Sequence, residues 1–133
     1  MADVYIDSTL HNDWNAKFNP ELCEALEAKG ITCHLPQRDT NQQGEPEGKF
    51  NQNIEGIKNA NILLAVASNE SPNWGVEVGF AHGIGKNIVA LATTEHAIPL
   101  MGKYMIADVV SVEDLDDIPS YIDTLVATIK THI

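Results

Sequence analysis

Short apolar runs alternate along this chain with amphipathic stretches, in an order typical of strands and helices that follow one another. The predicted strands cover residues 2–6, 31–35, 61–67, 87–91 and 105–110. Four helices are predicted. The first begins at Asn19-Pro20 and ends at Gly30, and the second runs from Phe50 to Lys58. The third contains Glu77 and ends at Gly83, and the fourth runs from 118 to 130. Five strands that alternate with helices predict an α/β fold with a parallel sheet and right-handed crossovers.

Two stretches interrupt this alternation. Residues 36–48 are polar and rich in turn-forming residues, which predicts a loop long enough to carry function. Residues 93–105 predict a loop with at most one helical turn, near Leu100. No repeat or linker divides the 133 residues, so we predict one domain over residues 1–133.

Composition narrows the class of partner. The chain is 44% hydrophobic and 20% charged, as in an ordinary globular protein. Its net charge of -11 argues against a nucleic acid polymer or a membrane surface as the main partner, because both require clustered Lys and Arg. A small anionic substrate remains possible. Cys23, Cys33 and the five histidines lack metal-ligand spacing, so no metal site is predicted. Without a signal sequence, a cytoplasmic protein with reduced thiols is expected.

Glu77 is the strongest candidate for chemistry. In a parallel sheet the loops after the first three strands share one rim, which would gather residues 7–11, 36–48 and 68–74. Glu77 lies one turn into the helix that follows the third strand, and Gly75 and Gly79 beside it let a substrate or a second backbone approach closely. Alternatively, Glu77 is a solvated acid in the first turn, favoured by the helix dipole.

These residues resemble those of the nucleoside 2-deoxyribosyltransferase family, including its relatives that hydrolyse 2′-deoxynucleoside 5′-monophosphates. The similarity is carried by Tyr5, by residues 53–61 and 75–81, and by Gly85-Lys86. It implies a flavodoxin-like fold, no cofactor, and a covalent mechanism in which a Glu attacks the anomeric carbon of the sugar. Glu77 falls on that nucleophile, and Tyr5 on a tyrosine that hydrogen-bonds it.

Two positions depart from the transferase pattern. Asn53, expected at the start of the helix before the central strand, stands where the family carries an Asp that protonates the departing base. An amide can orient a base by hydrogen bonds but cannot protonate it. Ser71, six residues before Glu77, also replaces an Asp, and the phosphate-dependent relatives have a serine there.

The first loop adds donors to this picture. Ser8, Thr9 and His11 are predicted to bind substrate, and Thr9 and His11 together with Ser71 would suit a 5′-phosphate. Met101 matches a residue that transferases borrow from a neighbouring subunit, but the accompanying Asn is missing and Pro99 departs from the pattern there. The resemblance therefore implies a homodimer or a higher homo-oligomer.

The predicted function is cleavage or transfer at the N-glycosidic bond of a 2′-deoxynucleoside or its 5′-monophosphate. Two alternatives stay open. A TIR-like NAD glycohydrolase also carries a Glu on the helix after a strand that ends in a serine-rich turn, here Ser68 to Trp74. A nucleotide-binding module with reduced catalysis is suggested because Asn53, Ser71 and Pro99 depart together.

Overall fold

A computed structural model describes residues 1–133 and contains one parallel sheet with the strand order β2-β1-β3-β4-β5. The strands are β1 (Val4–Asp7), β2 (Cys33–His34), β3 (Ile62–Val66), β4 (Asn87–Thr93) and β5 (Asp108–Val112). The helices are α1 (Asp13–Ala28), α2 (Pro36–Asp39), α3 (Pro46–Asn59), α4 (Pro72–Gly83), α5 (Leu100–Met105) and α6 (Ile118–His132). This sheet order confirms the flavodoxin-like expectation.

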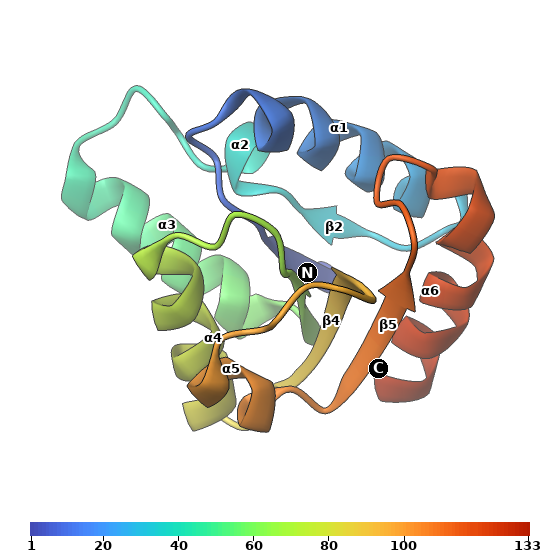
Figure 1. The fold of residues 1–133 in the computed structure, drawn as a ribbon. Coiled ribbons are helices and arrows are strands. Elements are labelled where there is room, and N and C mark those ends of the chain that lie inside the picture. The colour runs from blue at the N-terminus through green and yellow to red at the C-terminus, as the bar shows by residue number, and fades with distance from the viewer.

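The sheet separates two layers of helices (Figure 1). Helices α1 and α6 cover one face, and α3, α4 and α5 cover the other. Because side chains alternate across a strand, Ile6 joins the core under α1 and α6, whereas Tyr5 joins the core under α3 and α4. Asp7 follows Tyr5 by two positions and therefore shares its face. Tyr5 and Asp7, the residues of β1 with ionisable side chains on this face, therefore both lie on the side of the sheet that α4 covers.

Helix α1 begins at Asp13, so the predicted start at Asn19-Pro20 is wrong. The side chain of Asn12 caps the helix by accepting from the backbone N of Asn15 at 2.8 Å. Pro20 lies inside the helix and cannot donate to the carbonyl of Ala16. Gln37 Nε2 donates to that carbonyl instead, at 2.9 Å, so the backbone acceptor is satisfied from another element.

The predicted loop over residues 36–48 is helical at both ends. Pro36 occupies the first turn of α2, and Asp39 Oδ2 accepts from the backbone N of Leu35 at 2.9 Å, which stabilises this short helix. Helix α3 already begins at Pro46, before the predicted start at Phe50. Only residues 40–45 remain irregular, and they connect the edge strand β2 to the helix beside the site.

Candidate functional site

The site lies at the carboxyl ends of β1 and β3, beside the first half of α4. Tyr5 pairs with Leu63 and Asp7 pairs with Ala65 in the β1–β3 register. Ser71 caps α4 by accepting from the backbone N of Trp74 at 3.3 Å. This start point brings Glu77 over the end of β1, where open α/β sheets bind ligands.

Tyr5 and Glu77 are in direct contact, although 72 residues separate them. The Tyr5 hydroxyl donates to Glu77 Oε1 at 3.0 Å. Tyr5 is fully buried, and this burial together with the charge of Glu77 raises the pKa of the phenol, so the hydroxyl stays protonated. A permanent donor therefore stabilises and orients the carboxylate of Glu77.

Asp7 completes a pair of carboxyl groups that sequence reasoning did not select. Asp7 is 3% exposed and its Oδ2 has no hydrogen-bond partner, and the charge of nearby Glu77 adds to burial in raising the pKa of its carboxyl group. Burial is the main cause that raises the pKa of both carboxyls. The signal that could have found Asp7 is an acidic residue on the last position of a buried strand, two residues after Tyr5.

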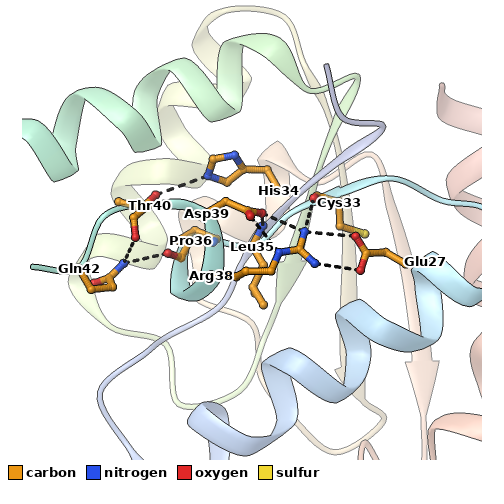
Figure 2. A network of polar contacts seen from close by, with 9 residues as sticks. All are labelled: Glu27, Cys33, His34, Leu35, Pro36, Arg38, Asp39, Thr40 and Gln42. Atoms are coloured by element: carbon orange, nitrogen blue, oxygen red, sulfur yellow. Dashed lines mark hydrogen bonds and ion pairs between the residues drawn. The ribbon is translucent and has the colours of Figure 1, made fainter.

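His34 supports Tyr5 from the neighbouring strand. The two rings are stacked with centroids 5.1 Å apart, and burial lowers the pKa of His34, which keeps the imidazole neutral. On its other side, His34 touches α3 at Gly56, where an added Cβ would come within 2.9 Å of the ring. Figure 2 shows the ring extending toward Thr40, whose hydroxyl lies 3.5 Å from His34 Nε2. None of these supporting residues was predicted.

Asn53 lies in the middle of α3, so the expectation that it starts the helix is wrong. Its Oδ1 accepts from the hydroxyl of buried Thr40 at 2.6 Å. This bond fixes the orientation of the amide, because the oxygen faces Thr40 and only the two N–H donors remain available. Asn53 can therefore act toward a substrate as a donor.

Thr9 joins two of the rim loops. Its hydroxyl donates to the backbone carbonyl of Asn69 at 2.9 Å and accepts from the backbone N of Ser71 at 3.0 Å. Asn69 adopts a positive φ of 55°, a conformation that Asn tolerates better than most residues. Thr9 thus positions Ser71, whose own hydroxyl hydrogen is not used by the cap.

The remaining predicted site residues are dispersed. Ser8 is buried on the α1 side, where its hydroxyl donates to Asn19 Oδ1 at 2.6 Å and accepts from Asn15 Nδ2 at 3.0 Å. His11 is exposed in the first loop. Gly75 is exposed, and an added Cβ would meet no atom within 4 Å. Met101 is 71% exposed on α5 and so is not enclosed by its own chain.

Two other acids in the predicted rim segments could supply a proton to a departing base, but both are already paired. Glu70 Oε2 lies 2.9 Å from His96 Nε2, which ties the loop before α4 to the loop after β4. Asp39 accepts from Arg38 Nε at 2.9 Å, and Arg38 in turn contacts both carboxylate oxygens of Glu27 (Figure 2). Asp7 is therefore the acid closest in placement to the nucleophile candidate.

No group of three or more His, Cys, Asp and Glu side chains is arranged to hold a metal ion. No helix has both the length and the apolar composition needed to cross a membrane. A cavity of about 510 Å³ lies along β2 and α3, lined among others by Thr32, His34 and Gln52. Glu77 does not line this cavity, and the site described above is defined by the carboxyl groups of Glu77 and Asp7.

Solved structures with the same fold include proteins of different function. A 2-deoxyribosyltransferase from Bacillus psychrosaccharolyticus is 23% identical with a TM-score of 0.72, over 92% of this chain and 94% of that one. The CMP N-glycosidase BcmB from Clostridium botulinum is 19% identical with a TM-score of 0.67, over 92% and 98%. The TIR domain of the Toll-related receptor TRR-2 from Hydra magnipapillata is 20% identical with a TM-score of 0.72, over 98% and 99%.

Sequence comparison identifies the family of this chain more specifically than the shared fold does. No curated protein sequence matches significantly. A sequence model of the nucleoside 2-deoxyribosyltransferase family, however, matches residues 4–118. That range contains Tyr5, Asp7, Asn53, Ser71 and Glu77 together with the elements that position them. The match confirms the resemblance seen in the sequence, and the chain belongs to the nucleoside 2-deoxyribosyltransferase family.

Proposed function

We propose that this protein cleaves or transfers the N-glycosidic bond of a 2′-deoxynucleoside or its 5′-monophosphate, with Glu77 as the nucleophile. The observation that carries the proposal is the 3.0 Å bond from the Tyr5 hydroxyl to Glu77 Oε1, formed between β1 and α4 at the rim of the sheet. A buried neutral donor holds one carboxylate oxygen and leaves the other for the sugar. Family membership supports glycosyl transfer as the class of reaction.

The chemistry follows the logic of a retaining glycosidase. A Glu77 oxygen forms a bond to the anomeric carbon, the carbon–nitrogen bond breaks, and its electron pair leaves with the base. Water or a second base then attacks the same carbon and releases Glu77. Asn53 would contact the departing base through its N–H donors, which suits an acceptor atom on that base.

A 5′-monophosphate is the preferred substrate form in this proposal. The free hydroxyl hydrogen of Ser71 lies at the amino end of α4, which favours an anion, and His11 is exposed in the neighbouring loop. Thr9 contributes by holding Ser71 in place. Ser8 is not needed, because its hydroxyl serves the network with Asn15 and Asn19. The N-glycosidase among the structural neighbours acts on a nucleoside monophosphate, as its name states.

The decisive experiment compares Glu77→Ala and wild type on deoxynucleosides, deoxynucleoside 5′-monophosphates and NAD, with base release as the readout. We expect cleavage of the deoxynucleotide by the wild type, a loss of about 10⁴-fold or more in the variant, and an unchanged circular dichroism spectrum. A slow 2′-fluoro substrate should leave a sugar on Glu77, detected by mass spectrometry. Substantial residual activity in Glu77→Ala would refute Glu77 as the nucleophile.

A matched variant tests the phosphate preference. Ser71→Ala should reduce kcat/KM for the deoxynucleotide by about tenfold, because one charge-assisted hydrogen bond contributes roughly 1.5–3 kcal/mol. The same change should alter kcat/KM for the free deoxynucleoside much less. Equal effects on both substrates would favour a transferase over a phosphate-dependent hydrolase.

The measurements with NAD test the alternative that this protein is a TIR-like NAD glycohydrolase. The TIR domain from Hydra shares the fold at 20% identity, which carries no information on activity. Release of nicotinamide from NAD without cleavage of deoxynucleotides would favour that alternative, and binding without any cleavage would favour a nucleotide-binding module.

A further inference from the structure

Asp7 and Glu77 bring two carboxyl groups near each other in the interior of this site. Asp7 follows Tyr5 by two positions on the face of β1 from which the Tyr5 hydroxyl reaches Glu77 Oε1, and the charge of Glu77 contributes to the raised pKa of Asp7, so the two carboxyls lie near each other. A hydrogen bond between two carboxyls requires a proton on one of them. Two ionised carboxylates in contact, one of them 3% exposed, would repel each other in a region with little water to screen them. One proton shared by the pair would remove this repulsion.

The surrounding groups indicate which carboxyl carries that proton. Glu77 is only partly buried and accepts from the Tyr5 hydroxyl at 3.0 Å, which favours its ionised form. Asp7 is almost completely enclosed, and its Oδ2 receives no donor from any other residue. The neighbouring strand places Ala65 opposite Asp7 and so brings no charge. The neutral member is Asp7.

We propose that protonated Asp7 is a positioning residue that donates a hydrogen bond to Glu77, and that Asp7 and Tyr5 together keep Glu77 ionised and aimed at the sugar. The consequence for activity rests on the function proposed above. Asp7 keeps its proton while Glu77 attacks, so it acts on the rate only through Glu77. The titratable groups near the pair are Tyr5 on the same strand and His34, which stacks behind Tyr5.

The pair predicts a particular pH dependence. Activity should rise as Glu77 ionises and fall again when alkaline pH removes the proton of Asp7, because the second carboxylate then repels the first. Burial raises the pKa of Asp7 well above its ordinary value, which places that fall at a higher pH than the ionisation of Glu77. Neutral His34 and the protonated Tyr5 hydroxyl carry no charge in this range.

The kinetic test uses two substitutions at one position. Asp7→Asn keeps a donor that cannot titrate, so its rate should exceed that of Asp7→Ala by about tenfold, and its alkaline decline should disappear. In Asp7→Ala, kcat should fall by roughly 10- to 100-fold with little change in KM, because the lost bond orients the nucleophile and does not hold substrate. An alkaline decline in Asp7→Asn identical to that of wild type would overturn the proposal.

A measurement without substrate separates this proposal from the proposed function. Nuclear magnetic resonance of protein labelled with carbon-13 at Asp and Glu carboxyls should show one protonated carboxyl at neutral pH, retained in Glu77→Gln. A wild type with every carboxyl ionised at that pH would refute the pairing even if Asp7 variants fail to fold. A protonated carboxyl that appears only in protein labelled at Glu would assign the proton to Glu77 and also refute it. A protonated Asp7 without any glycosidic cleavage would leave the pairing intact and refute the function.

Discussion

At the scale of single residues, the partial burial of Glu77 opposes the stability of the fold once its carboxyl group ionises. Burial raises the pKa of both Glu77 and Asp7 in the folded state. In the unfolded chain Glu and Asp ionise near their ordinary values, about 4. The unfolded state therefore releases protons first, and stability falls as pH rises from about 4 through the raised folded pKa values.

Glu77→Gln should remove part of the loss of stability that occurs as pH rises. The variant should gain roughly 0.5–2 kcal/mol in the free energy of unfolding at neutral pH, because an amide in this position carries no charge to bury. The gain should shrink as pH falls toward 4, where the carboxyl of the unfolded wild type also becomes protonated. Thermal denaturation of both proteins across this pH range measures the difference. A Glu77→Gln protein less stable than wild type at neutral pH would contradict the expectation.

Asn53→Asp tests the missing proton donor. The rate on deoxynucleosides should rise, up to the 10²–10⁴-fold that general acid catalysis commonly contributes. Thr40 limits this gain, since its hydroxyl would donate to the new carboxylate and favour the ionised form. Adding Thr40→Val should therefore raise the rate further, with Thr40→Val alone as the control. A flat or lower rate in both Asn53→Asp proteins would show that the base leaves without this acid.

Residues with a motif around them could be found from the sequence, and residues defined by three-dimensional contact could not. Glu77 and Tyr5 stand out through Gly75, Gly79 and the strand pattern, and the structure brings them into contact. Asp7 lies in the predicted rim, but only the buried contact with Glu77 marks it as important. Thr40 acquires its role because the residues after β2 fold back onto the middle of α3.

At the scale of elements, alternation of apolar runs and helical periods predicted the five strands and the parallel sheet, while element ends depended partly on distant partners. Asn19-Pro20 is a strong local start signal. Gln37 overrides it by satisfying the Ala16 carbonyl, a contact between residues 21 positions apart. Asn12 is also a local cap signal, but Pro20 favoured the later start, and only the distant contact with Gln37 shows that the helix continues through Pro20. The first helix was therefore predicted too short.

Helix α4 offers a prediction about its two glycines. Gly75→Ala and Gly79→Ala should each raise the free energy of unfolding by about 0.5–1 kcal/mol, because Ala favours a helix and an added Cβ meets no atom within 4 Å at either position. Gly85→Ala is the matched control and should be destabilising, since Gly85 has a φ of +80°. Chemical denaturation measures all three. If Gly75→Ala stabilises the fold yet reduces kcat/KM, the open face serves the close approach of substrate or a second backbone.

At the scale of the whole molecule, one surface carries more apolar side chains than a solvated face requires. Leu100, Met101 and Tyr104 of α5 are 70%, 71% and 79% exposed, and Val76 on the contacting helix α4 is 65% exposed. Single exposed apolar residues are common, but four on two adjoining helices are typical of an interface. This surface contains the residue that the family resemblance assigns to a neighbouring subunit.

We therefore expect a homodimer in solution through the α4–α5 surface, despite the net charge of -11. Met101→Glu should shift the protein toward monomer and reduce activity, because the introduced charge would have to be buried in the contact. Phe50→Glu is a suitable control, since Phe50 is 60% exposed on α3, outside this surface. Light scattering coupled to size exclusion reports the mass. A fully active wild-type monomer would contradict the expectation.

The contact between Gly56 and His34 bears on how this protein can vary. A methyl group at position 56 would come within 2.9 Å of a ring that stacks on Tyr5, so a shift of the ring toward Tyr5 would press on the phenol that hydrogen-bonds Glu77. Sequence changes on α3 would then tune the turnover rate without altering any group that meets substrate. In a collection of natural variants, position 56 should separate fast from slow proteins even where the carboxylates and the tyrosine are identical.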